Sequence, residues 1–509
     1  MSTDSPLGPL PAPDSREDID WSSLSPQASL LYAQVLQHQT LVDGTADATE
    51  LGTLDEVAEQ LGLDRQTCKE LHDELADLGD TRASQAPVEL ARQLYDALDA
   101  DQREPVFTAL VHDLARLSLV TEETPTDEER NQVLAVATVA FPDSAKAVVR
   151  KARQHVEADR ATVERDRDSL QAFVKQLDPK DIKNGNWFIA LLNHAVRTYT
   201  EKVDWKYFQD KYPGMPAPMI VDQRIKMAVR YASIEGGLAA GAFAGACLAP
   251  LPPVVVAAAS TTITTDVAYI TRLQLCLAWD IAMLYRVPLD LDDPHDLWKL
   301  IRVAFTIQGA AVGKGVIGKG VPAIVKELIK KYFAKDVLKA AKALPVVGKY
   351  LLKRTVVKMA VPVVSVPLAI VLNAVTTQLA GDHARSVFRD EARLVELAEK
   401  LTNRTRHPHL LPWVAFLVIT RDGKATDDEA TLMHHLLRLL YKRYDVHDEA
   451  LAKVIDLDPD DVWRRIDAET DDLSDLLEAA RRIAKADGSA TKREEAVIEQ
   501  LAARCDTAS

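Results

Sequence analysis

Four short segments of this chain carry acidic residues at a spacing that suits either cation binding or helix capping. The segments begin at Asp43, Glu122, Asp422 and Asp487, and each has a glutamate seven positions later. An Asp or Thr stands three residues before each glutamate, which is the pattern of a capping box, where two side chains satisfy backbone amides at a helix start. Carboxylate oxygens are also the ligands that Ca²⁺ and Mg²⁺ prefer. Both interpretations stay open at this stage.

If these segments bind a cation, the ligands come from the copies with the most complete pattern. The candidate metal-binding residues are Asp422, Glu429, Asp487 and Glu494, with Asp43 and Glu50 as weaker candidates. In the second copy Glu122-Glu123 replaces the Asp-Gly pair, which weakens a site there. The sequence establishes no cofactor, and Ca²⁺ or Mg²⁺ are the ions that such oxygens would select.

The elements that must position these residues are helices. Apolar residues recur every three or four positions on both sides of each segment, as in FTALVHDLARL, and no stretch alternates as a strand would. Each segment therefore predicts a helix, a tight turn and a capped helix, and the two pairs predict one bundle with an internal repeat near each end of the chain. We expect an all-α fold.

The repeated turn pattern resembles the TerB-like family, an α-helical bundle of the tellurite-resistance and co-chaperone type. The resemblance covers residues 25–142 and 405–507, and VAFLVITRDGKATDDEATLM carries it best. It implies two acidic turns close together and a proposed affinity for metal cations. We expect such bundles to recruit protein partners or sense cations, in envelope or tellurite-type stress.

The centre of the chain is organised around a long apolar stretch from Ile234 to Asp296. No charged side chain occurs from Gly236 to Thr265, and Pro250, Pro252 and Pro253 interrupt the run. Since proline deletes a helix hydrogen bond and clashes with the preceding turn, the stretch predicts two helical arms rather than one straight span. We expect a tightly packed hairpin, either buried in protein or dipping into a membrane from one side.

A strongly basic stretch follows the apolar one. Residues 314–358 contain twelve Lys or Arg and two acidic residues, in a chain whose net charge is -15. Lysines that flank an apolar helix face suit an anionic membrane surface or lipid, and pairing with the protein's own acidic residues is the alternative. The candidate lipid-contacting residues are Lys326, Lys330, Lys331, Lys335, Lys339, Lys342, Lys353 and Arg354.

The central region resembles the EcsC family. The resemblance spans roughly residues 185–390 and is carried by Thr265-Asp266, Arg272, Tyr285 before Pro288-Leu289-Asp290, and Asn373. The family implies a helical, membrane-associated domain without established catalytic residues. Asp266 and Arg272 lie almost two helical turns apart, so they are candidates for contact with a lipid headgroup; helix-cap and surface roles are the alternative. Asn373, in an apolar run, is expected to hydrogen-bond neighbouring backbone.

The expected organisation is therefore two TerB-like bundles flanking an EcsC-like domain. The segments are 1–24, a disordered acidic tail; 25–142, a degenerate bundle; 143–184, a charged, solvated helical connector; 185–392, the apolar and basic domain; and 393–509, the second bundle. The N-terminus lacks the basic start and apolar core of a signal peptide. Four scattered cysteines without a CxxC pair favour a reducing cytosol over a zinc site or disulfides.

Composition and motifs narrow the function. The acidic net charge argues against nucleic-acid binding, and no phosphate-binding, dinucleotide, zinc-protease or serine-hydrolase motif occurs. We expect a non-enzymatic protein, cytoplasmic and peripheral on the cytoplasmic membrane. In this hypothesis the central domain holds lipid and the bundles sense cations or bind partners. The alternatives are a lipid-binding or lipid-transfer protein with an internal apolar cavity, and a hydrolase with an unrecognised site.

Overall fold

The prediction of an all-α chain is confirmed. The computed structural model describes residues 19, 21–40, 42, 48–64, 66–67, 70–71, 86–120, 125–184, 186–247, 253–305, 365–421, 426–444, 459–469, 471–486, 488 and 490–507. Of these, 82% are helical and none lies in a strand. The chain forms two compact units, Met1–Asp280 with Ala343–Asp382, and Ile281–Lys342 with His383–Ser509.

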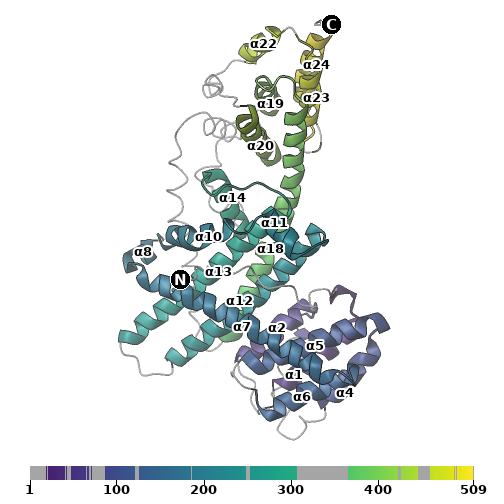
Figure 1. Cartoon of the computed structure of the whole chain (residues 1–509), viewed down its shortest axis with the longest axis vertical. Coiled ribbons are helices and arrows are strands. Elements are labelled where there is room, and N and C mark those ends of the chain that lie inside the picture. The colour runs from purple at the N-terminus through teal and green to yellow at the C-terminus, as the bar shows by residue number, and fades with distance from the viewer. Residues whose placement is uncertain are drawn as a thin grey trace. The chain divides into compact units, whose positions relative to one another are not determined.

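The first unit begins with a helical bundle (Figure 1). A short turn of 3-10 helix at Trp21–Ser23 precedes its helices, which are α1 (Pro26–Gln39), α2 (Ala48–Gln60), α4 (Ala86–Ala97), α5 (Ala100–Val120) and α6 (Asp127–Ala140). Helix α1 packs on α4 and α5, and α4 packs on α6. Within the apolar core, Tyr32 donates a hydrogen bond to Asp113 at 2.8 Å, so the buried carboxylate has a partner.

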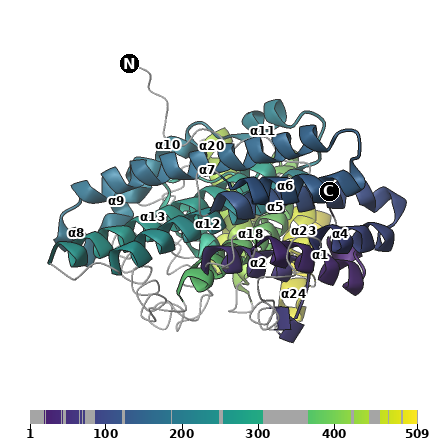
Figure 2. The ribbon, with the colours of Figure 1, turned by 90° about the horizontal axis from the view of Figure 1, so that it is seen from below.

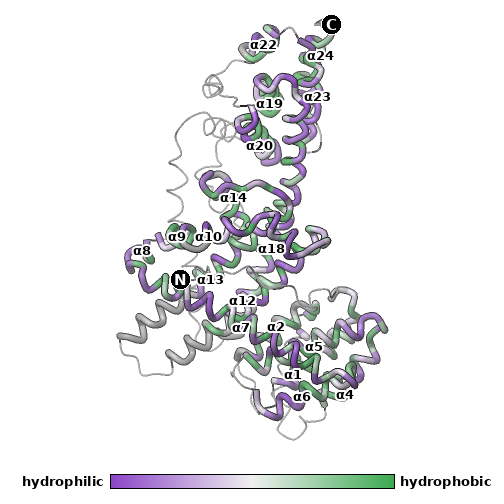
Figure 3. Tube along the Cα trace, viewed as in Figure 1, coloured by the Kyte–Doolittle hydropathy of each residue, from purple (hydrophilic) through white to green (hydrophobic). Residues whose placement is uncertain are grey.

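The long charged helix predicted after the bundle exists as α7 (Ala145–Gln176), but it is not a solvated connector. It packs on α5 and α6 and also on α12 (Figure 2). Figure 3 colours most of α7 as hydrophilic, with apolar residues in between; the residues that α7 buries form one stripe. The buried residues of that stripe recur every three or four positions: Ala152, Val156, Asp159, Val163, Asp166, Leu170 and Val174. One buried stripe suffices to pack a helix whatever the charge of its other faces, so the expected boundaries at 142 and 184 do not separate compact units.

The apolar centre of the chain forms two long helices, as its prolines predicted. Short elements lead into it: α8 (Pro179–Asn184), α9 (Trp187–Leu191), a π-helical turn at Leu192–Val196, α10 (Arg197–Thr200) and α11 (Trp205–Lys211). Helix α12 (Ala217–Cys247) ends before the prolines and α13 (Pro253–Leu284) begins at one of them, where the missing amide costs nothing. Arg224 bonds Asp280, and Tyr231 and Leu273 line one cavity, so these helices face each other in antiparallel register.

A third helix, α18 (Ser365–Arg404), lies against both. Its Asn373 bonds Asp266 at 3.2 Å and its Thr377 bonds Gln274 at 3.3 Å. A Cβ built on Gly381 would lie 2.7 Å from Ile225 Cγ1, so only glycine permits this approach of α18 to α12. Asn373 therefore pairs with a side chain of α13 rather than with neighbouring backbone.

The second unit contains α14 (Pro294–Ala304), the later part of α18 and a bundle. The bundle helices are α19 (Leu411–Thr420), α20 (Asp427–Tyr444), α22 (Pro459–Asp467), α23 (Ser474–Ile483) and α24 (Lys492–Thr507). One apolar core, running in sequence from Leu394 to Leu501, includes buried residues from all of them except α14. Helix α19 is buried from Leu411 through Ile419, and the other helices pack around it.

The predicted capping boxes are confirmed wherever the described residues include both partners. Thr126 caps α6, and Glu129 returns to the Thr126 amide at 2.7 Å. The Thr426 and Thr491 amides likewise donate to Glu429 and Glu494, each at 2.6 Å. In the first copy Glu50 is buried, and Asp47 lies outside the described residues. These contacts account for the spacing of the repeated motif.

Candidate functional site

A layer of buried ionisable side chains joins α7, α12 and α13 in the first unit. Arg230 Nε lies 2.8 Å from Asp159 Oδ2, and Arg272 Nη2 lies 3.5 Å from Asp166 Oδ2. Arg167 Nε lies 3.3 Å from Glu235 Oε1. All of these side chains are buried except that of Arg167, which is 18% exposed. Because an unpaired charge is costly in an apolar interior, such pairs fix which helix faces meet.

The most completely bonded group of the layer is Arg224 with Asp280 and Tyr199. Arg224 Nε donates to Asp280 Oδ2 at 2.9 Å, and the Tyr199 hydroxyl donates to Asp280 Oδ1 at 2.7 Å. Arg224 Nη2 also donates to the Tyr199 oxygen at 3.0 Å. Burial raises the pKa of Asp280, and the Arg224 guanidinium and the Tyr199 hydroxyl oppose that effect. The group thus connects α10, through Tyr199, to α12 and α13, which are the two helices of the predicted hairpin.

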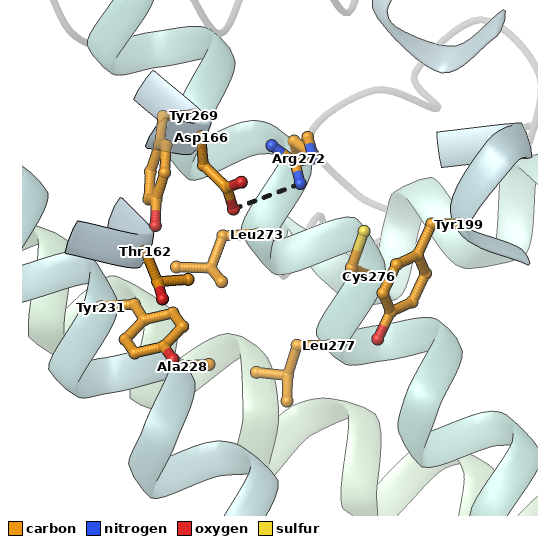
Figure 4. A pocket seen from close by; sticks show the side chains of 10 residues that line it. All are labelled: Thr162, Asp166, Tyr199, Ala228, Tyr231, Tyr269, Arg272, Leu273, Cys276 and Leu277. Carbon is orange, nitrogen blue, oxygen red and sulfur yellow. Dashed lines mark ion pairs between the residues drawn. The ribbon is translucent and has the colours of Figure 1, made fainter. Parts of the chain in front are cut away.

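A small cavity, lined by both polar and apolar side chains, lies beside this group (Figure 4). Its volume is about 30 Å³, which is room for one or two water molecules. Tyr231 Oη and Arg272 Nε and Nη2 are buried and make no hydrogen bond to the part of the chain that is described. Burial raises the pKa of Asp166 to about 6, against the opposing charges of Arg272 and Arg165. The cavity suits ordered water and is too small for an acyl chain.

The two headgroup candidates, Asp266 and Arg272, both belong to this layer. They are 5% and 3% exposed, so they are neither helix caps nor surface charges. Asp266 accepts a hydrogen bond from Asn373, and Arg272 is paired with Asp166. A lipid headgroup would have to displace these partners to reach either side chain.

Glu235 and Asp166 were not predicted as site residues from the sequence. Burial, and next the charge of Asp266, raise the pKa of Glu235 well above its usual range, and the nearby Arg167 opposes that shift. Besides Glu235, the layer contains as many aspartates as arginines: Asp159, Asp166, Asp266 and Asp280, with Arg167, Arg224, Arg230 and Arg272. The sequence does contain a signal for two of the four aspartates, because Asp159 and Asp166 stand seven residues apart in the apolar stripe of α7.

Beyond the layer, three helices continue without any charged residue. The charge-free ends are residues 236–247 of α12, 253–265 of α13 and 365–372 of α18. The charge-free end of α12 begins after Glu235, and those of α13 and α18 lie before Asp266 and Asn373. Because α12 and α13 are antiparallel and α18 bonds α13 at Asn373, the three ends leave the layer on the same side. We call this group of segments the apolar tip.

One helical stretch of the described chain, Thr265–Leu284, is long and apolar enough to cross a membrane. Within it, 89% of the most apolar window is buried by the protein itself. The core helix of a soluble protein has the same properties, so this stretch does not decide between a buried helix and a membrane span.

In the second unit the capping glutamates of α20 and α24 meet. The pKa of Glu429 is raised to about 7: burial raises it most, the charge of Glu494 and a hydrogen bond with Glu494 raise it too, and the bonds from Thr426 oppose them. Two neighbouring carboxylates offer oxygen ligands for a hard cation such as Ca²⁺ or Mg²⁺. Without a cation, burial and the neighbouring carboxylate favour the protonated form of Glu429. The other metal candidates, Asp43, Asp422 and Asp487, lie outside the described residues, and Glu50 belongs to the first unit's bundle.

Replacing Glu429 by glutamine is expected to stabilise the protein at alkaline pH. Because the folded-state pKa of Glu429 lies above the ordinary 4.5, ionisation weakens the fold as pH rises from 4.5 to about 7. Glutamine keeps the capping box. Urea denaturation should give a gain of about 1 kcal/mol at pH 8, after allowing for solvent screening, and none at pH 4.

Glu495, which follows Glu494 on α24 and is exposed, provides the control. Glu495→Gln should change stability little at either pH. Millimolar Ca²⁺ or Mg²⁺ should stabilise the wild type at pH 8, and not Glu429→Gln, if a cation binds the pair. Loss of stability in Glu429→Gln at both pH values would show that the carboxylate charge is needed instead.

No family model, curated protein or solved structure matches this chain. The TerB-like and EcsC-like resemblances therefore rest on the sequence motifs alone.

Proposed function

We propose that this chain is a non-enzymatic peripheral membrane protein that inserts its apolar tip into one leaflet of the cytoplasmic membrane. The observation that supports this most is the tip itself: three charge-free helix ends on one side of a buried ionic layer. An end of roughly twelve residues is about 18 Å long at 1.5 Å per residue. The hydrocarbon core of a bilayer is about 30 Å thick. The tip thus has the length to enter one leaflet without crossing both.

The ionic layer supports the same proposal through its position. Charged side chains are expensive in hydrocarbon unless they are paired within the protein. In this chain the ionisable residues stop at Glu235 and Asp266, which are buried and have partners within the protein, Arg167 and Asn373. The layer would hold the three helix ends together at the depth where the protein leaves the lipid.

The basic stretch 314–358 would supply the electrostatic part of binding. All eight candidate lipid-contacting residues named above lie outside the described residues. Each basic residue near an anionic surface contributes on the order of 1 kcal/mol. In this proposal the TerB-like bundles remain modules for partner binding or cation sensing, in envelope or tellurite-type stress.

The test is flotation of the full-length protein with liposomes of anionic or neutral lipid. The wild type is expected to float with anionic liposomes at low salt and less at high salt, because salt screens the basic stretch. The double variant Phe243→Asp/Val255→Asp places two charges in the tip. At roughly 2.5–3.5 kcal/mol per charge in hydrocarbon, partitioning should fall by a factor of about 100 or more.

Met219→Asp serves as a matched control, because Met219 is on the same helix α12 but is 49% exposed at its other end. This variant should float as the wild type does. A wild type that stays at the bottom of the gradient at low salt would end the proposal. Equal flotation of the wild type and the tip variant would show that the tip stays out of the lipid.

A further inference from the structure

The start of α14 and the middle of α20 bring a histidine against a carboxylate in the interior of the second unit. His434 Nε2 lies 3.2 Å from Asp296 Oδ1, and both side chains are 0% exposed. Asp293, one helical turn before Asp296, is partly exposed. One ligand atom from each of the three residues lies within 4.8 Å of the other two. The sequence analysis did not connect them, because they stand far apart in the chain.

The two oxygens of Asp296 differ in their surroundings. Oδ2 accepts a hydrogen bond from the Asp290 amide at 3.1 Å and another from Arg438 Nη1 at 3.1 Å. Arg438 Nη1 also donates to the Pro288 carbonyl at 2.8 Å, which fixes the guanidinium. Oδ1 accepts no hydrogen bond from the described part of the chain, although it is fully buried and faces His434. A buried carboxylate oxygen of this kind calls for an electropositive partner.

We propose that Asp293, Asp296 and His434 bind a divalent first-row transition metal ion, with Zn²⁺ as the best fit. Two ligand atoms that share such an ion, at about 2.0–2.2 Å each, lie about 3 Å apart. The observed 3.2 Å between Nε2 and Oδ1 already has that value. The site takes one imidazole nitrogen and two carboxylates, and water completes the coordination.

The surroundings of the three residues match those of metal ligands in general. Ligating carboxylates are usually held by hydrogen bonds to their other oxygen, as Asp290 and Arg438 hold Asp296. Arg438 and the two carboxylates together carry one negative charge, which a divalent ion reverses to one positive charge. An imidazole ligand favours Zn²⁺ and the other late first-row transition metal ions over Mg²⁺ and Ca²⁺, which prefer oxygen ligands alone.

The competing arrangement is a protonated His434 in an ion pair with Asp296, without metal. The two arrangements differ at Asp293, whose carboxylate binds the ion in the metal-bound arrangement and takes no part in the His434–Asp296 pair of the other. A bound ion would clamp the segment from Pro288 to Asp296 onto α20, so its expected role is to fix α14 against the bundle.

The experiment measures Zn²⁺ binding to the full-length protein by isothermal titration calorimetry at neutral pH. The wild type should bind one Zn²⁺ more than His434→Gln does, or bind it at least tenfold more tightly. Asp293→Asn should weaken binding by a similar factor. Co²⁺ should give visible absorption bands in the wild type that Zn²⁺ abolishes and that His434→Gln lacks.

His435→Gln and His409→Gln are the controls. His435 is adjacent but bonds Glu391, and His409 is 59% exposed beside Glu469. Both variants should retain the binding of the wild type, and circular dichroism should show that each variant is folded. Should His434→Gln unfold, Asp293→Asn decides alone, because its side chain is less buried. Equal Zn²⁺ stoichiometry and affinity in the wild type and these variants would overturn the proposal, as would a wild type that binds no Zn²⁺.

Discussion

Replacing Arg224 by leucine is expected to destabilise the protein by about 3–5 kcal/mol, because it leaves Asp280 buried without its counter-charge. Both side chains are 0% exposed, so water cannot replace the guanidinium. Tyr199 would remain as a hydrogen-bond donor to Asp280, but a hydroxyl does not neutralise a carboxylate. Urea denaturation of the variant and the wild type at pH 7 measures the difference.

The double variant Arg224→Leu/Asp280→Leu separates pairing from packing. Removing both charges should recover most of the loss, because an ion pair replaced by apolar groups is often neutral or stabilising. The loss in the single variant should also be smaller at pH 4 than at pH 7, since protonation of Asp280 relieves its unpaired charge.

Arg153→Leu provides the matched control, because Arg153 forms an exposed pair with Glu157 on α7. It should cost less than about 1 kcal/mol. A single variant Arg224→Leu that is as stable as Arg153→Leu would contradict the proposed role of the buried layer.

The features that local sequence decides were predictable. Capping boxes depend on residues three positions apart, so Thr126 with Glu129 and Thr426 with Glu429 follow from the sequence. The break between α12 and α13 follows from proline, which acts on its own helical turn. The all-α class follows from apolar periodicity, which is the strongest signal in a single sequence.

Helix α7 shows why a composition-based interpretation fails. Its many charges suggested a solvated connector, and the pairs Arg153–Glu157 and Arg160–Glu164 do lie along the helix as expected. A helix needs only one buried stripe to pack on its neighbours, and the stripe of α7 contains Asp159 and Asp166. A charged residue within such a stripe indicates a buried partner of opposite charge. The total number of charged residues in the helix does not reveal this, because most of them lie on other faces.

The ionic layer and the Asp296–His434 contact depend on tertiary structure. Arg224 and Asp280 are 56 residues apart, and Asp296 and Arg438 are 142 residues apart. No local pattern indicates which arginine meets which acid, because the pairing is set by the register of packed helices. Asp266 and Arg272 were correctly placed on one helix, but their burial depends on α7 and α18, which lie far away in the sequence.

Glu391 is expected to make the second unit sensitive to acid. It is 4% exposed, and its Oε1 lies 2.5 Å from Lys299 Nζ and 2.7 Å from His435 Nε2. Burial alone would raise the pKa of Glu391, but the bond from His435 and the charge of Lys299 outweigh it and lower the pKa to about 2. Because the folded-state pKa lies below the ordinary 4.5, the contribution is fully present above pH 4.5 and is lost as pH falls to about 2.

A shift of this size corresponds to about 3 kcal/mol at about 1.4 kcal/mol per pH unit. Urea denaturation from pH 6 down to pH 2 should show that loss in the wild type. Glu391→Gln should be less stable than the wild type at pH 6, because Lys299 keeps its charge without a carboxylate, and the gap should close toward pH 2. Glu396→Gln, which removes an exposed partner of Lys400 on the same helix α18, should leave the wild-type profile nearly unchanged. Parallel profiles for the wild type and Glu391→Gln would mean that the carboxylate is not held ionised by its neighbours.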